Sequence, residues 1–390
     1  MRRGGIAAFL LVLPLLLLLV LSFALPVGRM LWTAVADPEL SDTLPDTAAV
    51  LRAWNGEGLP PEEAFAHLAR ELGAALADRR LGPLAQRLNF EQPGLRALLL
   101  RTARAAGELR EAPRERLIAL DPRWGEAELW RLLRSAAGPV TALYLLRAVD
   151  LRLGPAGGIE AVAEEEAIYR TLFLRTLWIA ALVTALCVVL AYPVAAALAA
   201  LPQRLAAWGL VLVLVPFWTS VLVRTTAWFV LLQREGPLNA AAIALGLIEH
   251  PLQLIGTRFA VVAAMVHVLL PFAILPAYAV MRRLDPALPR AAASLGAGAV
   301  ARFFRVHLPL SFPGVAAGGA MVFLLAVGYY ITPALVGGPR DQMVASFIAF
   351  FLSQTPNWGM AAALSLLLLT MTGAAALAAR ALLPGFGRRE

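Results

Sequence analysis

The chain has 390 residues, of which 60% are hydrophobic and 15% are charged, and its formal net charge at pH 7 is +8. A mean hydropathy of +0.72 lies far outside the range of a soluble globular domain, so the composition indicates an integral membrane protein. All 34 basic residues are arginine, which excludes a standard phosphate-binding P-loop because that motif requires a lysine.

The first predicted element is an apolar run from Ile6 to Leu31, preceded by Arg2 and Arg3. A transmembrane helix needs about 20 mostly apolar residues, and this run is long enough. A cleaved signal peptide is the alternative, but its apolar core would be about 7 to 15 residues long and would end in a small-x-small site. We therefore predict a transmembrane anchor over residues 1–31.

Residues 32–170 have an ordinary soluble composition and are predicted to form a helical insert outside the membrane. The stretches Glu62–Leu81 and Gly94–Ala112 place Leu and Ala at helical spacing, which is typical of amphipathic helices that pack together. Three tryptophans of the insert could form a ligand platform, although a role in the core is the more common one: Trp54, Trp124 and Trp130.

Residues 171–390 are predicted to form a core of five further spans, with boundaries at Leu172–Ala199, Leu205–Leu232, Arg258–Val280, Gly314–Val336 and Met360–Leu383. The expected fold class is therefore an all-α polytopic membrane protein with six transmembrane helices. If the N-terminus is cytoplasmic, the inner segments hold an excess of arginine over acidic residues, as the positive-inside rule requires. These arginines are Arg2, Arg3, Arg204, Arg282, Arg283, Arg290, Arg302, Arg305, Arg388 and Arg389, against chiefly Asp285 and Glu390. Both termini are then cytoplasmic.

The chain has no HExxH or GxSxG motif and no paired carboxylates in its spans, so we expect no catalysis, no cofactor and no metal site. Cys187, His267 and His307 are interpreted as structural residues. The positive charge is expected to face anionic membrane lipid, so nucleic acid is not a predicted partner.

A candidate solute path is indicated by polar and aromatic residues at the outer ends of the third and fifth spans: Trp218, Arg224, Thr225, Trp228, Tyr329, Tyr330 and Thr332. Arg224 is an ionisable group inside a span, which is costly and therefore informative. Two interpretations stay open for it: a snorkelling or carbonyl-bonded structural arginine, and a residue on a water-filled path.

The stretch from Asp285 to Pro309 resembles the cytoplasmic EAA loop of permease subunits of ABC importers, whose pattern is E-A-A, three residues, G, nine residues, I-x-L-P. The matching positions are Ala291, Ala292, Gly296, Val306, Leu308 and Pro309, while Arg290 occupies the glutamate position. The likeness extends from about Tyr169 to the C-terminus, and this part of the chain is similar to spermidine/putrescine permeases. The insert is much longer than the segment that those permeases have between their first two spans.

This resemblance implies a non-catalytic permease subunit of an ABC importer in the bacterial inner membrane, for polyamine-like or other small organic solutes. Its implied partners are a separate ABC ATPase dimer, a second permease subunit and an extracytoplasmic solute-binding protein. Loop 281–311 would couple to the ATPase, through Asp285, Leu288, Arg290, Ala291, Ala292, Leu295, Gly296, Val306, Leu308 and Pro309.

Two other functions stay open. A secondary transporter would be expected to carry acidic residues in its later spans, which are absent here, and a membrane-anchored sensor would leave the five later spans unexplained. The loop itself predicts a short helix that starts after Asp285 and Pro286 and ends at Gly296 in the left-handed conformation.

Overall fold

The computed structural model describes residues 2–109, 112–154 and 158–382. Leu383, Arg388, Arg389 and Glu390 lie outside the described residues, as do the side chains of Arg2 and Arg3. The chain divides into two compact units, residues 1–169 with 351–366 and residues 170–350 with 367–390.

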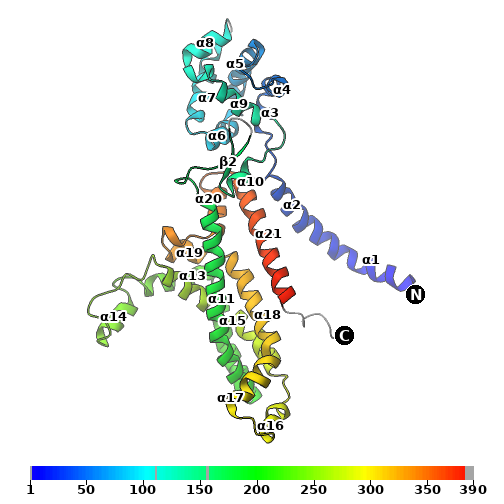
Figure 1. The fold of residues 1–390 in the computed structure, drawn as a ribbon, viewed down its shortest axis with the longest axis vertical. Coiled ribbons are helices and arrows are strands. Elements are labelled where there is room, and N and C mark those ends of the chain that lie inside the picture. Colours follow the sequence, from blue (N-terminus) through cyan, green and yellow to red (C-terminus); the bar gives the residue numbers. More distant parts are fainter. Residues whose placement is uncertain (1, 110–111, 155–157, 383–390) are drawn as a thin grey trace. The chain divides into compact units, whose positions relative to one another are not determined.

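The first unit begins with a helix that is apolar enough to span a membrane from Leu11 to Trp32 and has a short π-helical turn in its middle. The insert that follows is built from short helices and one hairpin (Figure 1). The elements of this unit are α1 (Arg2–Leu19), η1 (Val20–Ala24), α2 (Leu25–Trp32), α3 (Glu39–Thr43), α4 (Pro45–Ala53), α5 (Glu62–Ala77), α6 (Leu81–Glu91), α7 (Leu95–Arg104), η2 (Ala106–Leu109), α8 (Pro113–Leu120), η3 (Pro122–Gly125), α9 (Ala127–Ser135), α10 (Leu143–Arg147), β1 (Leu151–Leu153) and β2 (Ile159–Ala161).

The insert has its own hydrophobic core, made by the apolar faces of α3 to α9. Trp124 and Trp130 are fully buried in it, with ring centroids 5.5 Å apart, and Phe65 packs on Trp130 with centroids 4.5 Å apart. The indole N–H of Trp124 donates to Thr102 Oγ1 at 3.0 Å. The indole N–H of Trp130 donates to the carbonyl oxygen of Trp124 at 2.8 Å, and that of Trp54 donates to the carbonyl oxygen of Glu57 at 3.2 Å. The core role predicted for the three tryptophans is confirmed, because all three rings belong to this core.

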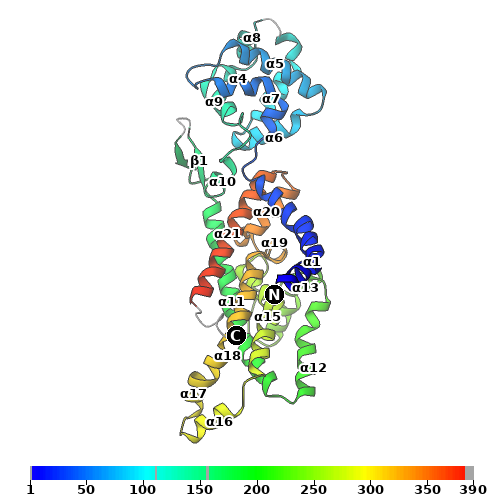
Figure 2. The ribbon, with the colours of Figure 1, turned by 90° about the vertical axis from the view of Figure 1, so that its right-hand side faces the viewer.

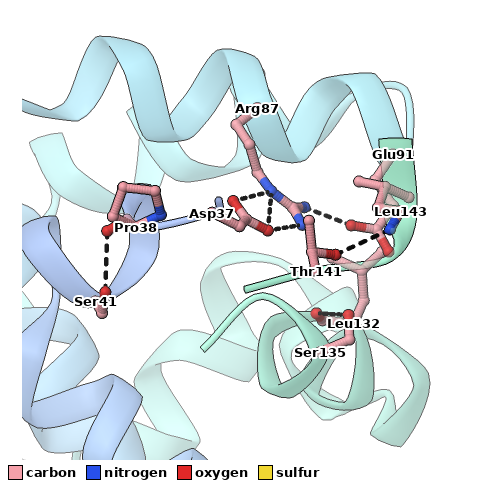
Figure 3. Close-up of polar contacts among 9 residues, drawn as sticks. All are labelled: Asp37, Pro38, Ser41, Arg87, Glu91, Leu132, Ser135, Thr141 and Leu143. Atoms are coloured by element: carbon pink, nitrogen blue, oxygen red, sulfur yellow. Dashed lines mark hydrogen bonds and ion pairs between the residues drawn. The ribbon is translucent and has the colours of Figure 1, made fainter. Parts of the chain in front are cut away.

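A buried ion pair joins the segment between α2 and α3 to α6 (Figure 3). The Arg87 Nε donates to the two carboxylate oxygens of Asp37 at 2.9 and 3.0 Å, and Nη1 donates to Glu91. The Asp37 side chain is 0% exposed and that of Arg87 is 4% exposed. Burial alone would lower the pKa of Arg87, but the hydrogen bonds and charges of Asp37 and Glu91 outweigh it and raise this pKa.

The insert also contains a two-stranded antiparallel sheet, which the prediction of helices alone missed. Leu151 pairs with Ala161 and Leu153 pairs with Ile159. The two strands lack apolar residues at helical spacing, and the sequence between them is rich in glycine. Hydrogen bonds across the hairpin therefore stabilise this segment in place of helix packing. The sheet is a small exception within an all-α fold.

Residues 351–366 belong to the same unit as the insert and contact its helices α6 and α10. The Gln86 amide donates to the carbonyl oxygen of Pro356 at 3.4 Å, and the rings of Phe90 and Phe351 meet edge to face at 6.3 Å. A Cβ on Gly359 would lie 2.3 Å from the ring of Tyr144. The start of α21 therefore depends on glycine for its close approach to the insert.

The second unit is a helical bundle in which α15 and α18 pack along each other and α11 runs beside them (Figures 1 and 2). A Cβ on Gly318 would lie 2.8 Å from the carbonyl oxygen of Ala273, so small residues allow this close contact. The elements are α11 (Tyr169–Ala200), α12 (Gln203–Leu214), η4 (Val215–Trp218), α13 (Val221–Leu231), α14 (Pro237–Ala244), α15 (Arg258–Met281), α16 (Ala287–Ser294), α17 (Ala299–Arg302), η5 (Phe303–His307), α18 (Leu308–Val327), α19 (Ile331–Val336) and η6 (Pro339–Asp341), with α20 (Val344–Ser353) and α21 (Trp358–Leu382) crossing between the units.

Among the described residues, five helices are long and apolar enough to cross a membrane, and a bent pair makes a sixth if it is counted as one span. This pair corrects the predicted continuous span Leu205–Leu232, because the segments Gln203–Trp218 and Val221–Leu231 meet at 91°. Pro216 lies in η4, just before the break at Thr219 and Ser220, and the Ser220 hydroxyl caps α13 by accepting the N–H of Leu222 at 3.2 Å. Proline and an N-cap serine together favour a helix start there.

The predicted span Gly314–Val336 is wrong at both ends. The candidate span runs from Ala299 to Val327, and the chain then breaks before α19 begins at Ile331. Gly328 caps the end of α18, while Pro309 is accommodated in the first turn of that helix, where its missing N–H costs little.

Candidate functional site

Loop 281–311 contains the predicted short helix, which is α16, and its ends are formed as the sequence indicated. Asp285 Oδ1 accepts the N–H of Ala287 at 2.8 Å at the start. At the end, Gly296 has φ of +83°, its N–H donates to Ala293 at 2.9 Å, and the N–H of Ala297 donates to Ala292 at 3.0 Å. These two bonds form a Schellman motif, which requires the left-handed conformation that glycine adopts without strain.

No residue of α16 is buried. Leu288 is 46% exposed and Leu295 is 88% exposed, and Val300 in α17 is 71% exposed. Ala291 is exposed and Ala292 is partly covered. The helix therefore presents an apolar surface that the rest of this chain leaves uncovered.

The other predicted residues of this loop lie on and after the helix. The Arg290 Nε donates to the carbonyl oxygen of Pro286 at 3.0 Å, so its stem folds along its own helix while the side chain stays exposed. Val306 lies in the π-helical turn η5, and Leu308 and Pro309 begin α18. The second half of the sequence pattern thus marks the point where the loop joins the bundle.

The predicted solute-path residues come together in part, on α13 and α19. The hydroxyl groups of Thr225 and Thr332 lie 3.2 Å apart, and both side chains are fully buried. Arg224 is half-buried, and its Nε is enclosed without a hydrogen-bond partner among the described residues. Buried polar groups in a span that lack partners mark a functional site or a wet cavity.

Trp228, also on α13, contacts His267 of α15, which the sequence predicts to be a structural residue. Its indole N–H donates to His267 Nδ1 at 3.1 Å, and the two rings lie edge to face at 5.8 Å. Since His267 and Trp228 are 39 residues apart, no local pattern signals this contact.

Among the residues that the structure describes, no hydrogen bond or ring contact joins Trp218 or Tyr330 to this cluster. Trp218 is 76% exposed and lies on the other side of the break from Arg224, and Tyr330 is 46% exposed in the turn before α19. The prediction that Trp218 and Arg224 share one helix is wrong, because the chain turns between them.

In the part of the chain that the structure describes, no three His, Cys, Asp or Glu side chains lie close enough to hold a metal ion. The buried thiol of Cys187 donates to the carbonyl oxygen of Val266 at 3.7 Å, which is a packing contact between α11 and α15.

Known proteins resemble this chain over about half of its length. It is 35% identical over 206 residues to the spermidine/putrescine transport system permease protein PotB of Escherichia coli (strain K12), which covers 53% of this chain and 75% of that protein. The PotB protein of Salmonella typhi is also 35% identical over 206 residues, covering 53% and 72%. The inner membrane ABC transporter permease protein YdcU of Escherichia coli (strain K12) is 35% identical over 210 residues, covering 50% of this chain and 66% of that protein.

No protein-family model matches the chain. Among solved structures, a bacterial alginate ABC transporter in complex with an alginate pentasaccharide-bound periplasmic protein matches with a TM-score of 0.46 and 15% identity. That match covers 54% of this chain and 77% of the other.

Proposed function

The chain belongs to the family of spermidine/putrescine-type permease subunits of ABC importers, and from this premise we propose how it works and with which partners. The protein is a multi-pass membrane subunit. In the proposed arrangement it lies in the bacterial inner membrane, with both termini and loop 281–311 in the cytoplasm and residues 32–170 outside the membrane. The arginine distribution supports this orientation.

The observation that carries the proposal is the exposed helix α16. It combines uncovered Leu288 and Leu295 with a rigid glycine-ended turn, and it lies beyond the ends of α15 and α18 in both views (Figures 1 and 2). A short helix with alanines on its surface can seat closely in a groove of another protein. We propose that the groove belongs to an ATPase subunit, and that ATP is hydrolysed on that partner chain.

The proposed solute path runs past the cluster of Arg224, Trp228 and Thr225. A second permease subunit would complete it, and an extracytoplasmic solute-binding protein would deliver the solute. The rings of Trp228 and Tyr329 offer π faces to a cation, and PotB relatives are named for spermidine and putrescine. Polyamine-like cations are the proposed solutes, although the charge of Arg224 would repel them in a low-dielectric path.

The experiment is reconstitution. The chain is purified from native membranes, its co-eluting subunits are identified, and the complex is placed in liposomes with ATP and labelled putrescine. We expect ATP-dependent uptake by the complex and no ATP hydrolysis by the chain alone. Turnover of ATP by the isolated chain, abolished by a point substitution within it, would contradict the proposal.

A further inference from the structure

Both ends of loop 281–311, which we call its first and second roots, form hydrogen bonds with the C-terminal part of α11 or the residue that follows it. At the first root, Arg282 Nη1 donates to the carbonyl oxygens of Ala199 at 2.8 Å and Leu201 at 2.9 Å. At the second root, the Tyr192 hydroxyl lies 2.8 Å from His307 Nδ1. A displacement of the loop therefore acts on α11 through these two contacts.

The contact at the second root continues into α18 as a chain of hydrogen bonds. The Tyr192 hydroxyl lies 3.1 Å from Ser311 Oγ, and Ser311 Oγ donates to the carbonyl oxygen of Leu308 at 3.1 Å. Since each hydroxyl has one proton, the consistent arrangement has His307 Nδ1–H donating to Tyr192 and Tyr192 donating to Ser311. Such chains polarise one another, and Ser311 is fully buried.

Aromatic rings surround this polar contact. The Tyr192 ring meets Phe303 edge to face at 5.6 Å, and Phe303 lies nearly parallel to His307, with 12° between the ring planes. Phe303 and His307 are the two ends of the π-helical turn η5. Single π-helical turns inside longer helices are frequent at functional sites.

The opposite end of α11 makes a second set of contacts. The Thr176 hydroxyl accepts the N–H of Val344 at 3.0 Å, and Arg175 Nη1 donates to the carbonyl oxygen of Gln342 at 3.4 Å. A single helix of 32 residues thus connects loop 281–311 to the segment that precedes α20. Pro193 removes one backbone hydrogen bond of this helix, so α11 can bend there. Tyr192 precedes Pro193 and therefore belongs to the part of α11 that continues to Thr176.

We propose that Tyr192 and His307 are positioning residues that pass the movement of loop 281–311 to α11, and through α11 to residues 342–344. The proposal rests on the proposed function, because a docked ATPase is what moves the loop. It assigns transmission to the Tyr192 contact more than to Arg282, which holds the part of α11 beyond Pro193.

The experiment compares Tyr192→Phe, His307→Leu and the double variant in the reconstituted complex. The Phe variant keeps the ring contacts and loses only the hydroxyl. We expect assembly and basal ATP hydrolysis to be unchanged, while the solute transported per ATP falls about five-fold, the factor that one net hydrogen bond supplies. Because both residues act through one contact, the double variant should be no worse than either single variant.

Two further variants separate transmission from stability. Thr184→Val removes a hydroxyl of α11 that donates only to Ala180 of its own helix, at 2.7 Å, and should leave the ratio of solute to ATP unchanged. His307→Asn places a polar nitrogen near the position of Nδ1 and should restore part of the ratio. An unchanged ratio in Tyr192→Phe, or loss of its assembly, would overturn the inference; absence of ATP-dependent uptake in the unmodified complex would instead overturn the proposed function.

Discussion

The hydroxyl of Thr225 in α13 lies 3.2 Å from the hydroxyl of Thr332 in α19, and both side chains are fully buried. Thr225 also donates to the carbonyl oxygen of Val221 at 2.9 Å, so the proton between the two threonines comes from Thr332. This bond joins two short helices that each follow a break in a predicted span. It therefore holds together the part of the bundle that carries Arg224.

Replacing Thr332 with Val keeps the shape of the side chain and removes the donor to Thr225. We expect the free energy of unfolding in detergent to fall by about 0.6 kcal/mol, the typical value for such a bond between membrane helices. Thr226→Val is the matched control, because the exposed Thr226 hydroxyl donates only to Leu222 of its own helix. Equal losses in the two variants would contradict a role for the interhelical bond.

Arg224→Ala tests which of the two interpretations of this residue holds. If Arg224 faces a solute path, removal of its positive charge lowers the barrier for cations, and uptake of putrescine relative to a neutral solute should rise on the order of tenfold. Uptake of labelled solutes into liposomes measures this ratio. Unchanged transport of every solute would assign Arg224 to the structure of α13.

Gly296→Val should produce a protein that inserts normally and yet loses ATP-driven uptake. No atom lies within 4 Å of an added Cβ, so the cost comes from the backbone at φ +83° and from bulk at the surface of α16. The left-handed conformation costs a β-branched residue about 1 kcal/mol or more.

Gly298→Val is the control for this change. Gly298 also has open space around it, but its φ is −63°. Uptake and stimulated ATP hydrolysis should be near normal in that variant, and full activity in Gly296→Val would be incompatible with a docking helix.

Arg87→Met should destabilise the insert by about 3 to 5 kcal/mol, because it leaves the buried carboxylate of Asp37 without its partner. Tryptophan fluorescence during thermal unfolding of the full chain reports this change through Trp124 and Trp130. The double variant Arg87→Met with Asp37→Leu should recover much of the loss. Arg80→Met is the control: its ion pair with Asp78 is more than half exposed on both sides, and such pairs contribute little.

The stability of the insert should also depend on the ionisation of Glu39. Burial raises the pKa of this carboxyl, Asp37 adds to the effect, and a backbone hydrogen bond and Arg87 oppose it. The folded insert therefore holds the proton more tightly than the unfolded chain does, so stability falls as pH rises from the ordinary glutamate pKa through the folded one.

Glu39→Gln should remove this loss of stability. At pH 8 we expect a gain on the order of 1 kcal/mol, since one oxygen of Glu39 is buried without a partner, and no gain at pH 4, where both states are protonated. Melting of the full chain at the two pH values measures the difference. Glu63→Gln, at an exposed position, should show no such pH-dependent gain.

The sequence predicts that apolar spans exist because apolar length is a local property, and five of the described helices satisfy it. It misplaces both ends of the span Gly314–Val336 and misses the break within Leu205–Leu232. It also predicts the ends of α16, where Asp285 and Gly296 act on their immediate neighbours. The break at Thr219 and Ser220 escapes a hydropathy window, because both sides of the break are equally apolar. Pro216 was the available indication.

The contacts of the candidate site were less accessible. Thr225 and Thr332 are 107 residues apart, and Tyr192 and His307 are 115 residues apart. Such pairs depend on how helices rotate and cross, which composition does not determine. The sequence shows that each stretch is polar, but it does not show which side chain each polar residue contacts.

The contact between Gln86 and Pro356 determines when, during synthesis of the chain, the insert can finish folding. The two residues are 270 positions apart, and residues 351–366 form one unit with the insert. Ribosomes make the insert long before they make this segment, so the faces of Phe90 and Tyr144 stay uncovered while the intervening helices enter the membrane. The packing of the insert is therefore completed only after residues 351–366 have been synthesised and have reached it.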